Sequence, residues 1–189
     1  MRKILLSALM ISLLLLCACG AASGDEARIE AFRETLRGSA YVSFTAEMRA
    51  DDGQSTENYV LRCEKRDGET VMELLSPELL AGVRAHVSGK NAALEYDGLS
   101  FEAGTLTDGG VTPMSAPKLL LDALSGGTVS QLRREEYDGA VTAAYCTELG
   151  EGLQAVLRLD VQSFLPHSAE LLCDGRTVIT CRITDWHME

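Results

Sequence analysis

The stretch LRCEKRDGETVMEL, residues 61–74, determines the predicted fold of this chain. Asp67-Gly68 at its centre predicts a two-residue hairpin turn, because both residues tolerate the positive φ angles that such turns require. With this turn, apolar residues face one another on one side of the hairpin and opposite charges meet on the other. The facing pairs are Leu61 with Leu74, Cys63 with Met72, and Arg62 with Glu73. A shift of register by one residue would mix the two faces, so the pattern predicts antiparallel strands in this register.

The dipeptide Asp-Gly recurs along the chain and predicts a series of such hairpins. It occurs at residues 52–53, 67–68, 97–98, 108–109, 138–139 and 174–175. The turns at 97–98 and 138–139 also separate an apolar from a polar face. Their apolar pairs are Tyr96 with Leu99, Leu94 with Phe101, and Leu132 with Tyr145.

The hairpin at Asp174-Gly175 needs a different loop. A two-residue turn would place Ile179 and Cys181 on the polar face. We therefore expect a three-residue loop, Asp174 to Arg176, with a bulge that restores both residues to the apolar face.

Two helices interrupt about eleven predicted strands. Residues 26–37 carry apolar residues at helical spacing and end before Gly38. A second helix follows Ser115 as its N-cap and stops at Gly126, after a long loop over residues 105–117. One helix precedes six strands and the other precedes five.

The predicted fold class is α+β. A large antiparallel sheet with one apolar face must cover that face. We expect a strongly curved sheet of about eleven strands, an unclosed half-barrel, with the two helices covering its concave face.

The first residues of the chain predict export. Arg2 and Lys3 precede an uncharged stretch, Ile4 to Leu16, that is too short for an ordinary transmembrane helix. The sequence that follows, LCAC at residues 16–19, resembles the bacterial lipobox, with the small residue Ala18 before the cleavage point. This resemblance implies a lipoprotein signal peptide over residues 1–18 and a diacylglyceryl anchor on Cys19. A plain secretory signal is the alternative.

The expected domain organisation is a lipidated tether over residues 19–25 and one domain over residues 26–189. Removal of residues 1–18 removes two basic residues and no acidic one, which leaves 15 basic and 28 acidic residues and a net charge of −13. So acidic a domain argues against binding nucleic acid and against lying flat on anionic lipid. It suits a solvated domain held at the outer face of the cell membrane by its anchor.

The remaining chemistry-bearing residues do not predict an enzyme. His86, His167 and His187 lie far apart in the sequence and lack the spacing of metal ligands, so we expect neither metal nor cofactor. The serines lack a nucleophile-elbow motif. Four cysteines remain after processing, at positions 63, 146, 173 and 181. The sequence leaves open whether they form disulfides, and small buried side chains are the favoured interpretation.

Two longer stretches resemble the LolA/LolB-like lipoprotein-carrier superfamily, which also includes the RseB amino-terminal domain. Residues 59–102 carry a charged hairpin, then LSP and a glycine, then a strand ending in YDG. Residues 159–186 are similar to the closing strands of the family, including the proline before the penultimate strand. The resemblance implies an unclosed curved barrel whose concave cavity, in the family's carriers, shelters acyl chains. Other relatives, the spore germination lipoproteins, bind a cell-wall amidase.

The apolar concave face is the predicted site. By strand parity its lining residues are Phe44, Met48, Leu61, Met72, Leu94, Tyr96, Phe101, Tyr145 and Leu157. The first hypothesis is a lipid, acylated or hydrophobic ligand bound in this face. The second is a non-enzymatic partner or regulatory lipoprotein of the cell envelope, in which the same residues form a filled core.

Overall fold

The computed structural model describes residues 24–89, 91–104, 111–150 and 152–189. A first helix covers residues 24–38, and the second, α2, covers Ala116–Ser125. The strands are β1 (Tyr41–Asp51), β2 (Thr56–Arg66), β3 (Glu69–Ser76), β4 (Arg84–Ser88), β5 (Asn91–Tyr96), β6 (Leu99–Gly104), β7 (Ser130–Tyr137), β8 (Ala140–Gly150), β9 (Leu153–Asp160), β10 (Pro166–Cys173) and β11 (Arg176–Met188). A short 3-10 helix, η1 (Glu78–Leu80), joins β3 to β4.

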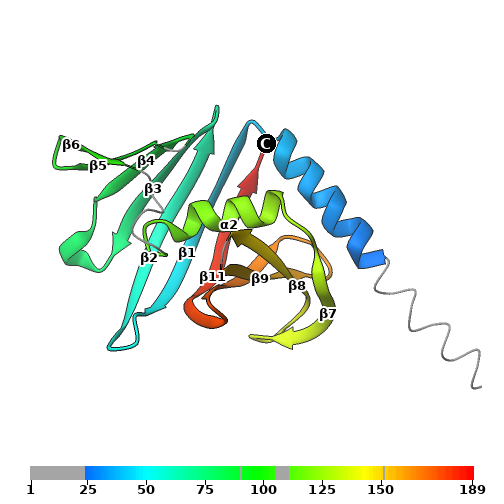
Figure 1. Ribbon diagram of the computed structural model, residues 1–189. Helices are drawn as coiled ribbons and strands as arrows, with labels where there is room; N and C mark the ends of the chain where they lie inside the picture. The colour runs from blue at the N-terminus through cyan, green and yellow to red at the C-terminus, as the bar shows by residue number, and fades with distance from the viewer. Residues whose placement is uncertain (1–23, 90, 105–110, 151) are drawn as a thin grey trace, which may run out of the picture.

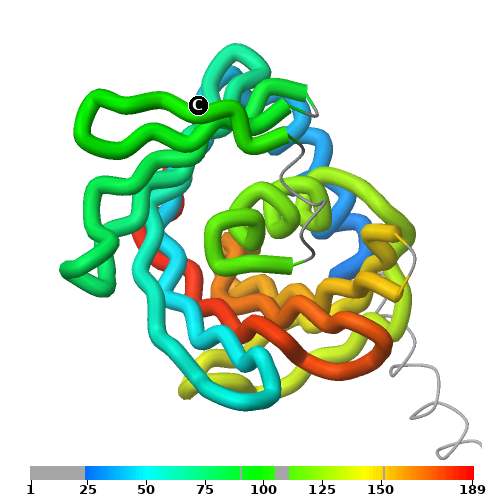
Figure 2. The backbone as a smooth tube through the Cα atoms, turned by 60° about the vertical axis from the view of Figure 1, so that its left-hand side comes forward, coloured from blue at the N-terminus to red at the C-terminus, as the bar shows by residue number. Residues whose placement is uncertain are grey.

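All eleven strands form one antiparallel sheet in the order β6-β5-β4-β3-β2-β1-β11-β10-β9-β8-β7. The first and last strands, β1 and β11, pair at its centre, and each half is a series of neighbouring strands (Figure 1). The sheet curls around α2 without closing, so β6 and β7 are its two free edges (Figure 2). The predicted fold class, with one helix before six strands and one before five, is confirmed.

The Asp-Gly turns set the register. Asp67, Asp97, Asp138 and Asp174 have φ angles of 51°, 50°, 49° and 50°, and each is followed by a glycine with positive φ. The pairings of Leu61 with Leu74 and of Leu94 with Phe101 are confirmed. The pair at residues 108–109 lies outside the described residues, as does the first half of the predicted loop over 105–117.

Two of the predicted hairpins differ in detail. The three-residue loop at Asp174 is wrong, because Cys173 pairs with Arg176 across a two-residue turn. The bulge lies one step further along, next to Leu171, and it restores Ile179 to the apolar face as expected. Leu132 is not paired with Tyr145, because the register shifts between Ser130 and Arg133.

The first helix begins earlier than the sequence pattern predicts. Residues 24 and 25, expected in the tether, are helical. Asp25 is buried and accepts hydrogen bonds from Arg134 Nε at 2.6 Å and Nη2 at 2.7 Å. This bidentate contact with β7 lowers the pKa of Asp25. This end of the helix is therefore fastened to the sheet, and residues 24 and 25 are part of the helix; residues 19–23 of the predicted tether lie outside the described residues.

The helices cover the concave face and fill its centre. Seven of the ten residues of α2 are buried, and the helix packs on β2, β8 and β9. The first helix buries Ile29, Phe32 and Leu36. Trp186 on β11 joins the two layers, with its ring 5.3 Å from Phe44 and 6.0 Å from Phe32.

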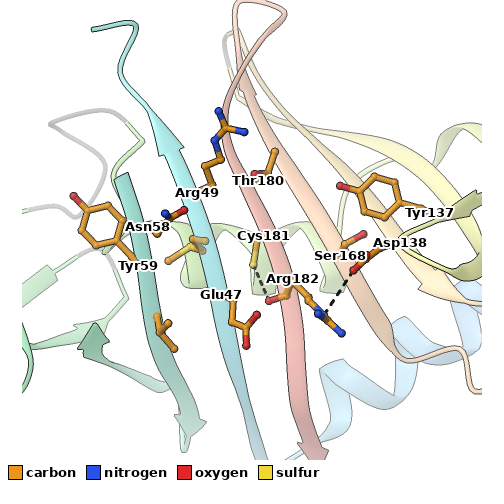
Figure 3. Close-up of a pocket in the computed structure, with 12 residues that line it drawn as sticks. Glu47, Arg49, Asn58, Tyr59, Tyr137, Asp138, Ser168, Thr180, Cys181 and Arg182 are labelled. Atoms are coloured by element: carbon orange, nitrogen blue, oxygen red, sulfur yellow. Dashed lines mark hydrogen bonds and ion pairs between the residues drawn. The ribbon is translucent and has the colours of Figure 1, made fainter. Parts of the chain in front are cut away.

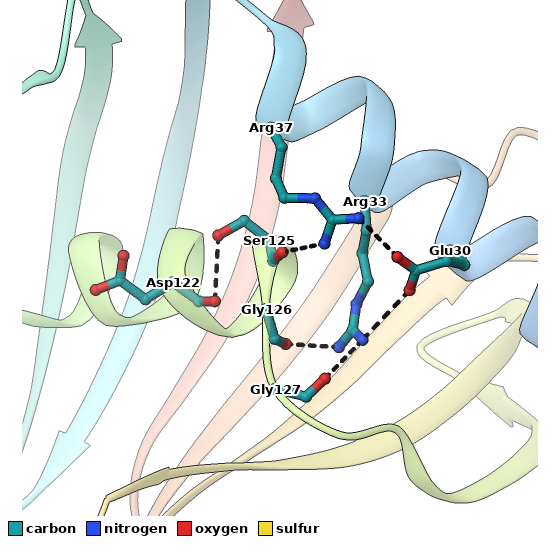
Figure 4. A network of polar contacts seen from close by, with 7 residues as sticks. All are labelled: Glu30, Arg33, Arg37, Asp122, Ser125, Gly126 and Gly127. Atoms are coloured by element: carbon teal, nitrogen blue, oxygen red, sulfur yellow. Dashed lines mark hydrogen bonds and ion pairs between the residues drawn. The ribbon is translucent and has the colours of Figure 1, made fainter.

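Arginines of the first helix fasten it to the end of α2 (Figure 4). Arg33 donates to the carbonyl oxygens of Gly126 at 2.8 Å and Gly127 at 2.9 Å. Arg37 donates to the carbonyl of Ser125 at 2.9 Å and to Glu30 at 2.6 Å. The arginines thus bind the carbonyl of Ser125, the last residue of α2, and those of the two glycines that follow it, which suits the negative end of a helix dipole.

The four cysteines of the described residues are unpaired, which favours the interpretation of small buried side chains over disulfides. Cys63 and Cys181 are buried, and burial raises the pKa of Cys181 to about 12. Within the described residues, the structure contains no helix long and apolar enough to span a membrane.

Candidate functional site

Six of the nine predicted lining residues are core. Their exposed fractions lie between 0% and 3%. They are Phe44, Met48, Leu61, Met72, Tyr145 and Leu157. All six belong to one apolar cluster with the buried residues of both helices. Burial raises the pKa of Tyr145 to about 12, so its phenol is neutral at physiological pH.

The other three predicted residues lie at the uncovered end of the sheet. The core reaches Val87 on β4 and Ala92 on β5 and then stops. Leu94 is partly buried, whereas Tyr96 is 51% exposed and Phe101 is 60% exposed. The structure thus separates the predicted site into a filled centre and an open end. Binding of a ligand by these residues stays a prediction.

We name this open end the apolar wing, formed by Leu94, Tyr96, Leu99 and Phe101. Tyr96 pairs with Leu99 and Leu94 with Phe101, so all four side chains share the concave face. Figures 1 and 2 both show β5 and β6 projecting beyond the helices. Large exposed apolar patches on a soluble domain mark interaction sites.

Helix η1 carries two further exposed apolar side chains. It precedes β4, whose first residue, Arg84, pairs with Glu95 at the end of β5. The 3-10 helix therefore lies at the same end of the strands as the β5–β6 turn. Leu79 is 88% exposed and Leu80 is 43% exposed, which enlarges the uncovered apolar surface at this end of the sheet.

Strand β6 is a free edge with unpaired backbone groups. All six of its residues are exposed. The residues that flank a two-residue turn form a hydrogen-bonded pair, and bonded and non-bonded pairs then alternate. Tyr96–Leu99 and Leu94–Phe101 are the bonded pairs, so Ser100 directs its N–H and C=O away from β5. Neither proline nor lysine protects this edge, although both commonly do so.

The opposite face of the wing carries a charged cluster that the sequence pattern did not predict. His86 on β4 contacts Glu69 through Nδ1 at 3.2 Å and Glu95 through Nε2 at 3.0 Å. Arg84 and Glu73 form an ion pair at 3.3 Å. These contacts join β3, β4 and β5 and keep the wing in line with the rest of the sheet.

A groove of about 640 Å³ crosses the convex face, over β2, β1 and β11 (Figure 3). Glu47, Arg49, Thr180 and Arg182 line it, and their positions alternate with buried residues that face the helices. Tyr137 and Asp138 of the β7–β8 turn close one side, where Asp138 lies 3.8 Å from Arg182. The groove is open and of mixed charge.

A buried ion-pair cluster lies beside this groove. Arg158 contacts Glu135 at 2.6 Å and Glu170 at 2.8 Å, and its guanidinium stacks 4.0 Å from the Tyr137 ring. Burial raises the pKa of Glu135, but the hydrogen bonds from Arg158 and Arg133 outweigh burial, so the pKa is lowered overall. All the charges are paired, as in a structural cluster that ties β7 to β9 and β10.

The described residues do not bring together three histidine, cysteine or carboxylate side chains in an arrangement that could hold a metal ion. The surfaces with a distinct chemical character are therefore the apolar wing and the convex groove. Both are suited to binding. The wing differs more from an ordinary protein surface, because large apolar side chains are exposed on it.

No protein-family model and no curated protein sequence matches the chain. Solved structures do resemble it. An uncharacterized conserved protein from Thermus thermophilus aligns with a TM-score of 0.55 and 9% identity, over 87% of this chain and 88% of that one. A putative outer membrane lipoprotein-sorting protein domain from Vibrio parahaemolyticus aligns with a TM-score of 0.53 and 12% identity, over 86% and 91%.

A chain from the structure of the Clostridioides difficile CwlD amidase in complex with the GerS lipoprotein is 19% identical, over 87% of this chain and 95% of that one. Its TM-score of 0.44 is too low to carry an argument. The likeness to the sorting-protein domain concerns the fold, and it agrees with the curved, unclosed sheet that the sequence resemblance implied. At these identities the likeness defines the fold and leaves the ligand or partner open.

Proposed function

We propose that the mature protein is a membrane-anchored extracytoplasmic lipoprotein that works by binding another envelope protein and not by catalysis. One observation favours a protein partner over a lipid ligand. The helices fill the centre of the concave face, whereas the wing at the free edge is left apolar and uncovered. A carrier of acyl chains needs an enclosed apolar cavity, but a shallow apolar edge suits an extended segment of protein.

The binding mode that fits this edge is strand addition. An extended segment pairs with β6 through the N–H and C=O of Ser100 and covers the side chains of Leu99 and Phe101. Acidic residues, Glu95, Asp97 and Glu102, lie around the wing. The expected partner segment therefore alternates apolar with basic residues.

A hydrophobic or acylated ligand is the second candidate. The observation in its favour is that the wing residues belong to the same sheet face as the core. A ligand held there would cover Tyr96 and Phe101 and reach α2 only if that helix moved. This candidate predicts a lipid on the wing where the first predicts a polypeptide.

The test is photo-crosslinking in cells. A benzoylphenylalanine at position 99 is expected to form a covalent adduct with a protein, and the same residue at Leu75, which is 37% exposed on β3, is the matched control. Ser100→Pro removes the outward N–H of β6 without breaking a bond to β5 and should abolish the adduct. Ser100→Ala should keep it. An adduct that persists in Ser100→Pro refutes strand addition, and an adduct with lipid supports the second candidate.

The anchor has a separate test. Cys19→Ala should leave the precursor unprocessed or release the protein from the membrane, and Cys17→Ala should do neither. Metabolic labelling with a fatty acid, followed by membrane fractionation, measures both outcomes. If Cys17→Ala loses the label and Cys19→Ala keeps it, the assignment of the lipidated cysteine is wrong.

A further inference from the structure

The point at which the anchor joins the domain constrains how the domain meets the membrane. Only residues 20–23 lie between Cys19 and Gly24, where the described part of the first helix begins. At about 3.5 Å per residue, the five steps from Cys19 to Gly24 span at most about 18 Å. A domain of this length is about 40 Å across. The start of the helix therefore stays near the bilayer, a conclusion that rests on the proposed lipidation of Cys19.

Side-chain contacts hold the start of the described helix against the sheet. Asp25 is bound to Arg134 of β7 by the two hydrogen bonds described above. Arg28 donates to the carbonyl oxygens of Val161 at 3.0 Å and Gln162 at 3.1 Å. Its guanidinium also lies 3.8 Å from the centre of the Phe164 ring. These contacts fix β7 and the β9–β10 turn relative to the end of the helix that lies nearest the anchor.

Exposed apolar side chains lie near this point, next to the acidic residues Glu136 and Asp160. Leu165 in the β9–β10 turn is 39% exposed and Val141 is 52% exposed. They lie close together, because Val161 N–H donates to the carbonyl of Val141 and Asp160 N–H donates to that of Leu165. Arg28 contacts Val161 and Gln162, and Arg134 pairs with Ala143, two residues from Val141. We call this surface the anchored pole: Arg28, Arg134, Val141, Gln162 and Leu165.

We propose that the anchored pole rests on the lipid bilayer and that the apolar wing points away from it. Figures 1 and 2 both place the start of the first helix and the β5–β6 hairpin at opposite ends of the molecule. A short tether holds the pole at an effective concentration on the order of millimolar, so even a weak contact with the bilayer is populated. The orientation leaves β6 open to proteins of the envelope.

The test uses the lipidated full-length protein in vesicles of phosphatidylcholine, which is uncharged overall, that carry a nitroxide on the lipid headgroup. A thiol-reactive fluorophore is placed on Gln162→Cys at the pole or, as the matched control, on Leu99→Cys at the wing. Cys146→Ser and Cys173→Ser remove the partly exposed thiols, Cys63 and Cys181 are buried, and the lipid blocks Cys19.

The probe at position 162 should lose most of its fluorescence to the nitroxide, and the probe at position 99 should keep its own. Val141→Ser with Leu165→Ser should weaken the quenching at position 162. Equal quenching at the two positions, or stronger quenching at position 99, overturns the orientation. Protein that does not sediment with the vesicles shows that the anchor itself has failed, which is a separate result from vesicle-bound protein with an unquenched pole.

Discussion

Leu120→Ala tests whether α2 belongs to the core or can leave the concave face to a ligand. Leu120 is fully buried in the apolar cluster that contains both helices and the central strands. Its replacement removes apolar side-chain atoms from contact and leaves a cavity between α2 and the sheet. Substitutions of buried leucine by alanine cost about 2–5 kcal/mol, and the value depends on how far the site can collapse.

The strands β2, β8 and β9, which pack against α2, limit such collapse. We therefore expect a loss near the middle of the range, about 3 kcal/mol. In a domain of this size each kcal/mol corresponds to about 2–4 °C, so the melting temperature should fall by about 6–12 °C. Urea denaturation and thermal melting of the purified domain measure the change.

Leu79→Ala is the matched control, because Leu79 is 88% exposed on η1. It should change the free energy of unfolding by less than about 0.5 kcal/mol. If Leu120→Ala costs as little as Leu79→Ala, then α2 contributes nothing to the core. The concave face would then be free for a ligand, and the assignment of function to the wing would be refuted.

The remaining predictions concern the helix start and the end of α2. Asp25→Asn should destabilise the domain at neutral pH, because the lowered pKa of Asp25 means that its charged form stabilises the fold. That stabilisation is present above the ordinary Asp pKa of about 3.9 and is lost as the pH falls through the lower pKa that Asp25 has in the folded protein. The free energies of unfolding of the wild type and the variant should therefore converge in acid. Values that stay apart would contradict the role of the Arg134 contact. Gly127→Ala should cost more than about 2 kcal/mol, because φ is +76° and a Cβ would collide with Thr147 Oγ1. Gly98 has φ +75° but open space around it, so Gly98→Ala should lower the free energy of unfolding by only about 1 kcal/mol, the cost of placing alanine in the left-handed region. Equal losses in the two glycine variants would show that the collision with Thr147 is relieved.

The sequence predicts the sheet well because each hairpin carries local information. Asp-Gly fixes the turn, and the alternation on either side fixes the register, as in β2 and β3. The bulge in β11 was anticipated from the faces of Ile179 and Cys181, but its position was not. A bulge restores the faces wherever it lies in the strand, so alternation alone leaves its position undetermined.

The candidate site was predicted less well, because coverage by the helices is a tertiary property. Strand parity assigns Phe44 and Phe101 to the same face, yet one is 1% and the other 60% exposed. The difference arises from where α2 ends relative to β5 and β6, which no local pattern encodes. The buried contact of Asp25 with Arg134 was missed for the same reason, since its partners are far apart in the sequence.

Native mass spectrometry of the domain, purified without detergent from cells that express it without its anchor, tests most directly whether the concave face is a packed core. A filled core predicts the mass of the polypeptide alone, for the wild type and for Phe101→Ser alike. A co-purified acyl ligand that is retained by the wild type and lost from Phe101→Ser would contradict this account and support a lipid carrier.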